Sequence, residues 1–263
     1  MMKLERKKYL YLGVSILSLT VFLTVWYLIT KVFQVFPPQA LSDPISILKI
    51  LIYKWTNRPP DGGTLLEHIW ASLQLALYGF FLGAVIGIPL GIIMGWNRVA
   101  DMLVTPLFQF LRPIPPIAWI PIMLIFFGIG QTAKAAVIFV ATVTNCILNS
   151  YYGIKQTKDV HLWVASTFGA SSLYRLFHVA IPSALPMIFA GLNLSLNVAW
   201  MSLVAAEMLA ASKGLGYLIQ YSRMMARADL VIAGMITITI IGAVLTKILS
   251  IVEDTVIKGR HLK

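Results

Sequence analysis

Six apolar segments divide this chain, and together they hold more apolar surface than a soluble domain of this size can bury. An α-helix of about 20 apolar residues crosses the ~30 Å hydrocarbon core of a bilayer. Of the 263 residues, 59% are hydrophobic and 12% are charged, which predicts an all-α, polytopic membrane protein. The six predicted spans are approximately Tyr9–Thr30, His68–Met94, Pro115–Gly128, Ala133–Tyr151, Ser183–Glu207 and Leu230–Ile251.

The distribution of positive charge predicts which ends of the spans face the cytoplasm. Lys3, Arg6, Lys7 and Lys8 precede the first span, and no small-residue cleavage site follows it, so we expect an uncleaved helix with its N-terminus inside. The inner segments are then the N-terminus, 95–114, 152–182 and the tail, and they carry most of the 21 lysines and arginines. The net charge of +11 is typical of cytoplasmic loops and lipid headgroups, and nucleic acid is not an expected partner.

The longest predicted outer connection, Lys31–Glu67, contains a helix signal. Ser42-Asp43-Pro44 is typical of a helix start with proline in the first turn. Apolar residues then recur at helical spacing over a length too short to cross a bilayer: Ile45, Leu48, Ile52 and Trp55. The pattern fits both an interfacial helix and a packed connecting helix.

The second span carries a glycine every four residues: Gly79, Gly83, Gly87, Gly91 and Gly95. Glycines at this period leave a groove in which another helix approaches closely. The groove favours helix packing inside the subunit, with a subunit-dimer surface as the alternative. Pro89 in the same helix predicts a kink.

Two further patterns are candidates for a translocation path. The segment 111–121 contains four prolines, which must break the helix and form either a gate or an elbow before span three. Polar side chains also follow one face of span four (Thr142, Asn145, Asn149, Tyr152) and one face of span five (Asn193, Asn197, Trp200, Val204, Glu207). Such stripes suit either a hydrated path or hydrogen bonds between helices. The candidate path or gate residues are Pro113, Pro115, Pro116, Trp119, Asn145, Asn149, Asn193, Asn197, Trp200 and Glu207.

The segment Trp163–Pro182 is polar, punctuated by glycine and predicted to be an exposed helix. Gly169 allows close approach by another chain, and Pro182 is expected to stop the helix before span five. Periodicity alone predicts only an amphipathic helix on the membrane surface.

This segment resembles the cytoplasmic EAA loop of ABC-importer permeases. Ala165, Gly169, Val179, Ile181 and Pro182 match the register of that loop, whereas Trp163 and Val164 replace its glutamate and first alanine. Across about 64–256 the chain is similar to the taurine, alkanesulfonate and nitrate branch of the family. The matching motifs are L-R-P-I-P-P-I-A-W-I-P at 111–121, F-F-G-I-G at 126–130, G-A-S at 169–171, I-P-S-A-L-P at 181–186, L-V-A-A-E-M-L-A at 203–210 and G-L-G at 214–216.

The resemblance implies a type I importer permease in a bacterial inner membrane, with a five-helix core at 64–256 after an N-terminal helix and external segment at 1–63 and before a cytoplasmic tail at 257–263. It also implies two permease copies, most simply a homodimer in the lipid bilayer, two ATPase subunits that bind ATP and Mg²⁺, and one external solute-binding protein. The residues expected to couple to the ATPase are Trp163, Ala165, Phe168, Gly169, Ala170, Ser171, Arg175, Val179, Ile181 and Pro182.

Other function classes lack their sequence signals. No phosphate-binding G-x-x-x-x-G-K-[ST] or zinc-binding H-E-x-x-H motif occurs, so we expect no enzyme activity, metal or bound cofactor in this chain. The single cysteine, Cys146, excludes a disulfide framework. By resemblance the transported solute is a small anion, taurine or another sulfonate first, with nitrate, bicarbonate, an aromatic acid or a vitamin precursor as alternatives. A secondary transporter is the more distant alternative, although no inverted repeat is evident.

Overall fold

The computed structural model describes residues 2–258, and within this range it contains helices and connecting segments but no strand. Among the described residues, five helices are long and apolar enough to cross a membrane, or six if a bent helix pair at 98–127 forms one span. The predicted all-α membrane architecture is therefore confirmed. The chain divides into two compact units: Met1–His68 with Leu218–Thr237, and Ile69–Tyr217 with Ile238–Lys263.

The first unit contains α1 (Met2–Tyr27), the π-helical turn η1 (Leu28–Val32) and α2 (Pro44–Thr56). Almost the whole apolar stretch 13–32 is exposed, as a lipid-facing helix requires. The predicted start of α2 is confirmed, because the Asp43 carboxylate accepts hydrogen bonds from the backbone N–H groups of Ile45 and Ser46 at 3.1 and 3.0 Å. The predicted apolar stripe of α2 is exposed, which favours the interfacial interpretation.

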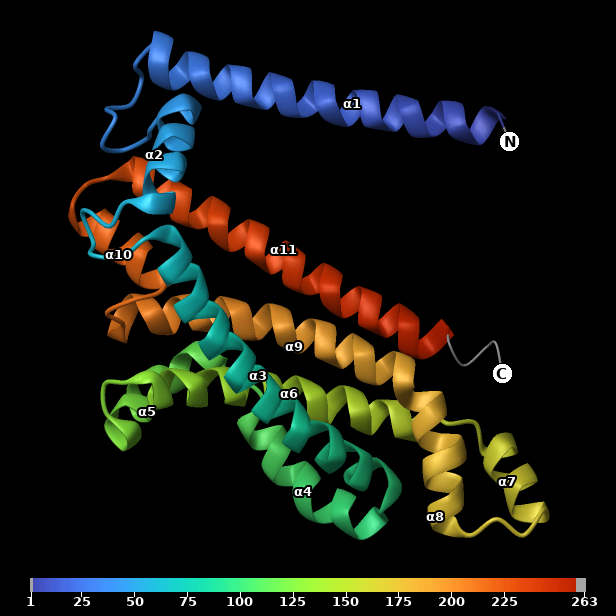
Figure 1. The fold of residues 1–263 in the computed structure, drawn as a ribbon. Helices are drawn as coiled ribbons and strands as arrows, with labels where there is room; N and C mark the ends of the chain where they lie inside the picture. The colour runs from blue at the N-terminus through green and yellow to red at the C-terminus, as the bar shows by residue number, and fades with distance from the viewer. Residues whose placement is uncertain (1, 259–263) are drawn as a thin grey trace. The chain divides into compact units, whose positions relative to one another are not determined.

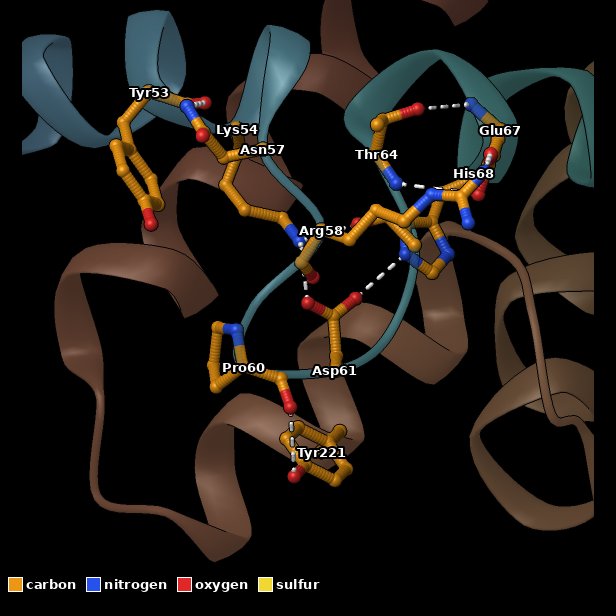
Figure 2. A network of polar contacts seen from close by, with 11 residues as sticks. Tyr53, Lys54, Asn57, Arg58, Pro60, Asp61, Thr64, Glu67, His68 and Tyr221 are labelled. Carbon is orange, nitrogen blue, oxygen red and sulfur yellow. Dashed lines mark hydrogen bonds and ion pairs between the residues drawn. The ribbon is translucent and has the colours of Figure 1, made fainter.

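The loop between α2 and α3 is held by three buried ionisable side chains (Figure 2). Lys54, 1% exposed, pairs with Asp61 and donates to the carbonyl oxygens of Arg58 and Gly63 at 3.0 and 2.5 Å. His68 Nε2 lies 2.6 Å from the other Asp61 carboxylate oxygen. Burial alone would raise the pKa of Asp61, but the hydrogen bonds from His68 and Lys54 and the Lys54 charge hold it below its ordinary value. The loop is thus fixed by a buried, charge-compensated cluster.

The glycine groove of α3 (Leu65–Trp96) receives α6 (Gln131–Lys155) inside the second unit. A Cβ added at Gly79, Gly83, Gly87 or Gly95 would lie 2.5–2.8 Å from the Cβ of Ile138, Thr142, Cys146 or Ile154. The contact residues therefore recur every four residues on both helices and in the same order, so α3 and α6 run in the same direction. The prediction of packing within the subunit is confirmed for this groove.

A neighbouring face of α6 packs against α9 (Ile181–Ala210) in antiparallel orientation. A Cβ added at Gly153 of α6 would lie 3.0 Å from the Cβ of Ala184. Nearer the N-terminal end of α6, Cys146 Sγ lies 3.3 Å from Ser195 Oγ of α9. The chain ends in α10 (Leu215–Met224) and α11 (Ala228–Lys258) within the described residues, and α11 extends beyond the predicted end at Ile251. Of the predicted tail 257–263, residues 259–263 lie outside the described residues.

The prediction of a loop at 95–114 is wrong, because this segment contains the helix α4 (Arg98–Leu111). Asn97 caps α4 by accepting hydrogen bonds from the N–H groups of Val99 and Ala100. The predicted break at the proline cluster is confirmed: α4 and the following segment, η2 (Pro116–Trp119) with α5 (Ile120–Phe127), are bent by 85°. Proline rings and their missing N–H groups exclude a continuous helix here.

Candidate functional site

The segment predicted to couple to an ATPase is a helical hairpin of α7 (Asp159–Thr167), α8 (Ser172–Arg175) and the π-helical turn η3 (Leu176–Ala180) (Figure 1). The expectation of one short helix is wrong, because the chain turns at Gly169, where φ is +77°. The Gly169 N–H donates to Ser166 O, and the Ala170 N–H donates to Ala165 O. These two bonds form a Schellman turn, in which glycine adopts the left-handed conformation at no steric cost.

The start of α8 is fixed by side chains of the hairpin itself. Ser171 caps α8 by accepting a hydrogen bond from the Tyr174 N–H at 3.3 Å. Arg175 donates to Ser166 Oγ at 2.7 Å, which ties α8 back to α7. The hairpin is therefore a defined structure in which two predicted coupling residues, Ser171 and Arg175, have a local structural role.

The hairpin exposes large apolar side chains. Trp163 is 66% exposed and Phe168 is 85% exposed, and further exposed residues are Val164, Leu173, Tyr174 and Phe177. The predicted coupling residues Ala165, Ala170 and Val179 are half-buried. An exposed apolar surface of this kind on a polar segment marks an interaction site.

Pro182 does not end a helix, and this expectation is wrong. The chain is helical from Ser172 to Leu209, with η3 and α9 continuous and Pro182 in the first turn of α9. The turn widens at η3, where the Ile181 N–H donates to Leu176 O, five residues back. A π-helical turn accommodates the proline by changing the local hydrogen-bond register. The hairpin is thereby joined to α9 without a break.

The predicted path residues fall into two groups, and the first group packs between helices. Asn149 is buried, donates to Asn145 O at 2.9 Å and fills the space beside Gly191 of α9. Trp200 is buried and donates to Ile238 O of α11 at 3.2 Å. Asn149 bonds within its own helix and packs against α9, and Trp200 bonds to α11, so for these two residues the structure favours helix packing over a wet surface.

The second group of path residues lies nearer to solvent. Asn193 is half-buried and donates to Glu253 of α11 at 3.0 Å, while Asn197 is exposed and donates to Asn193 O. Asn145 is half-buried on α6. At the bend, Pro113 and Pro115 are exposed, and Pro116 and Trp119 are half-buried. These residues remain predictions for the path or gate.

Glu207, another predicted path residue, joins three segments of the second unit. It is 1% exposed, and its carboxylate accepts hydrogen bonds from Ser72 Oγ at 2.8 Å and the Gly216 N–H at 2.9 Å. Ser72 Oγ in turn accepts from the Leu215 N–H at 2.8 Å. A Cβ at Gly214 would collide with the carboxylate, which gives the G-L-G motif a physical reason. Sequence reasoning missed Ser72, which carries no signal of its own among the small residues of α3.

Comparison with known proteins identifies the family. Residues 87–260 match the family described as binding-protein-dependent transport system inner membrane component. The chain belongs to this family. It is 37% identical over 234 residues to the taurine transport system permease protein TauC of Escherichia coli (strain K12), covering 88% of this chain and 84% of TauC. It is 34% identical over 209 residues to the nitrate import permease protein NrtB of Synechococcus elongatus, covering 78% of this chain and 74% of NrtB.

The fold of this ABC-importer permease also matches a solved structure. A chain of the MetNI methionine ABC transporter in an inward-facing conformation superposes with a TM-score of 0.62 at 19% identity, over 74% of this chain and 95% of that chain. The predicted importer-permease fold and inner-membrane family are therefore confirmed. The hairpin, bend and buried carboxylate belong to a multi-pass transport subunit.

Proposed function

We propose that this permease carries a small anion, taurine or another sulfonate, into the cell with energy from a partner ATPase. The support for the substrate class is the similarity to TauC and NrtB, whose names specify taurine and nitrate. Nitrate, bicarbonate, an aromatic acid or a vitamin precursor would pass through a permease of the same type, because an external binding protein makes most of the selection.

The observation that carries the proposal is the apolar surface of the 159–180 hairpin. Trp163, Phe168 and Phe177 are exposed on short helices whose turn is fixed by Gly169. A rigid, apolar projection is suited to a groove on a second protein, because it loses little conformational entropy on binding. In the proposed orientation, with both termini in the cytoplasm, this groove belongs to the ATPase that holds ATP and Mg²⁺.

The continuous helix through η3 suggests how ATP drives transport. The proposed complex contains two permease copies, as a homodimer, with two ATPases and one binding protein. Closure of the ATPases would move the hairpin, and α9 would follow because the helix is unbroken from Ser172 to Leu209. The packed pair of α9 and α6 would then alternate between outward-open and inward-open states.

The experiment is a mild-detergent pull-down of the tagged chain from its native membrane, followed by mass spectrometry. We expect a Walker-motif ATPase in near-equal amount. Phe168→Ser should abolish its recovery, whereas Ile129→Ser should not, although Ile129 is equally exposed, at 86%, on the connection before α6. Recovery of the chain alone after crosslinking would contradict the proposal and favour a secondary transporter.

A further inference from the structure

Arg112 is the only charged residue in a long apolar segment of the chain. No other charged side chain occurs between Asp101 and Lys134. The large apolar side chains on both sides of Arg112 are exposed: Leu107, Phe110, Leu111, Ile114 and Ile117. Such a surface needs lipid or protein around it, which favours the bent pair at 98–127 as one span over a loop in water.

Contacts with α6 show where Arg112 lies in that span. At the start of α4, Asp101 Oδ2 lies 3.0 Å from the Nζ atom of Lys155, the last residue of α6. Beyond the bend, Ile120 packs in a buried cluster with Val137, in the second turn of α6. Because α6 is long enough to cross a membrane, these two contacts lie near its opposite ends. Arg112 lies between them along the chain.

The lengths of the helices convert these contacts into a depth. Val137 and Lys155 are about 27 Å apart along α6, at 1.5 Å per residue. The turn at 112–115 is compact, with a backbone hydrogen bond of 3.1 Å across it, and η2 adds only about 8 Å at 2.0 Å per residue. The helix α4 must therefore rise into the bilayer to complete this distance. From Asp101 onward it rises about 15 Å, which is half of a ~30 Å hydrocarbon core, so Arg112 lies near the middle of the bilayer.

Two predicted path residues lie at the same depth. Asn145 is half-buried near the middle of α6. Asn197 of α9 is exposed, and it lies two residues beyond Ser195, whose Oγ atom is 3.3 Å from Cys146 Sγ of α6. Exposed polar groups in the middle of a bilayer do not face lipid. Water or a polar solute therefore has to reach the level of Arg112.

The surroundings of Arg112 favour a water-filled path over contact with lipid. The side chain is exposed, and its guanidinium group makes neither a hydrogen bond nor an ion pair among the residues that the structure describes. Pro113 and Pro115, which interrupt the helix beside it, are exposed as well. At this depth a charge and a broken helix are retained only where they face water or another part of a protein.

A second copy of the chain does not supply a counter-charge at this point. In a symmetric contact the same face of both copies meets, so Arg112 would approach the Arg112 of the other copy. No acidic residue occurs between Asp101 and Lys134 to compensate these like charges. The partner of the guanidinium group is therefore sought among the anions that pass through the protein.

We propose that Arg112 lines the translocation path near the middle of the bilayer and contacts the anionic group of the transported solute. This group is an oxyanion of the sulfonate, nitrate or carboxylate class, because the planar guanidinium group donates two parallel hydrogen bonds to a pair of oxygens. The inference rests on the proposed anion import and assigns a residue to it.

The first test replaces Arg112 with glutamine, which removes the charge, and with lysine, which keeps it. Arg98→Gln is the matched control, because Arg98 is an exposed arginine at the other end of α4. Each variant is assembled with the ATPase and binding protein in proteoliposomes, and ATP-driven uptake of labelled taurine, nitrate and bicarbonate is measured per chain inserted.

We expect Arg112→Gln to lower the maximal uptake rate about ten- to a hundredfold, the factor that a charge-assisted hydrogen bond contributes. Arg112→Lys should lose less, and Arg98→Gln should keep most of the uptake. Normal uptake by Arg112→Gln would overturn the inference. An equal loss in Arg98→Gln would overturn it too, because the effect would then not depend on the depth of the charge.

A charge rescue separates contact with the solute from a role in packing. Arg112→Cys places a thiol at an exposed position, whereas the native Cys146 is buried. Aminoethyl methanethiosulfonate then adds a positive charge to this thiol, and sulfonatoethyl methanethiosulfonate adds a negative one. The cationic reagent should raise uptake at least about tenfold over the unmodified variant, and the anionic reagent should not raise it. Equal effects of the two reagents would assign Arg112 to packing and overturn the inference.

The same thiol distinguishes this inference from the proposed function. In a path with alternating access, the anionic reagent should modify Arg112→Cys at rates that differ at least about fivefold between the nucleotide-free and vanadate-trapped complex, whereas Arg98→Cys should react equally in both. If the vesicles transport none of the three anions but the rates differ in this way, the path assignment stands and the import proposal fails. If an anion is transported and the rates for Arg112→Cys are equal, the contact is wrong and the import proposal stands.

Discussion

The buried loop cluster allows a quantitative prediction, because the same loop contains one buried and one exposed ion pair (Figure 2). Lys54 and Asp61 are 1% and 0% exposed, whereas Arg58 and Glu67 are 68% and 32% exposed. The perturbation is Asp61→Asn, which keeps the shape of the side chain and removes its charge. Lys54 then keeps its two carbonyl acceptors but loses its counter-charge inside the protein.

The expected cost follows from burial. Removal of one partner from a buried ion pair typically costs about 3–5 kcal/mol, because the other charge stays buried and uncompensated. Neutralising Glu67 with Glu67→Gln should cost at most about 1 kcal/mol, because solvent screens the exposed pair. Glutamine also keeps an oxygen that can accept the hydrogen bond that the Thr64 N–H donates to Glu67 Oε2 at 3.4 Å. Asp61→Asn should therefore destabilise the closed loop severalfold more, in free energy, than Glu67→Gln.

The assay is the rate at which trypsin cuts the purified chain after Lys54. This side chain is buried, so cutting requires the loop to open, and the rate follows the open population when opening is rapid. Arg58 is followed by Pro59, a bond that trypsin cuts poorly, so the Lys54 product is distinct. At about 1.4 kcal/mol for each tenfold change, Asp61→Asn should speed cutting by about a hundredfold or more, and Glu67→Gln by less than about fivefold.

Two results would refute this reasoning. If Asp61→Asn is cut within threefold of the wild-type rate, the cluster does not hold the loop closed. If Glu67→Gln is cut as fast as Asp61→Asn, burial does not set the difference between the two pairs. In either case the fixed conformation of this loop would have to be explained by packing alone.

Three further predictions concern the second unit. Gly91→Leu should lower the stability of the fold by about 1–3 kcal/mol, because its Cβ would lie 2.8 Å from the Cβ of Ser150 on α6. A thiol-reactive dye should then label the buried Cys146 at a lower temperature. Gly13→Leu should leave this temperature unchanged, since nothing lies within 4 Å of a Cβ there. In the same assay, Ser72→Ala should destabilise by about 1.5–3 kcal/mol, because a buried carboxylate loses a donor. Gly169→Val should lower ATPase recovery about tenfold, at a strain of about 1–2 kcal/mol, and Gly169→Asn should keep most of it. Equal recovery with Val and Asn would exclude a backbone cause.

The sequence predicted five of the six spans and the cap of α2 because those features depend on nearby residues, whereas the predicted span Pro115–Gly128 contains only the short η2 and α5. A run of apolar residues and the pair Asp43-Pro44 contain their whole physical cause within a few positions. The helix α4 was missed for the opposite reason. Its exposed apolar face lies between polar residues and prolines, and the charge-based topology required an inner connection there, so its helical period was not considered.

Periodicity could not predict contacts between residues that lie far apart in the sequence. The four-residue glycine step indicated a groove on α3, but only the structure shows that α6 fills it with residues at the same step. Pro182 was expected to end a helix because the rule for proline assumes an α-helical register. The wider turn at η3 changes that register, and a π-helical turn has no signal in this sequence.

The polar residues inside the membrane show why a stripe does not by itself define a path. A polar side chain in an apolar environment needs a partner, and a partner in the same chain satisfies this need as well as a transported solute does. Trp200 and Glu207 have such partners on neighbouring segments, and Asn149 has one in its own helix, so their positions require no solute.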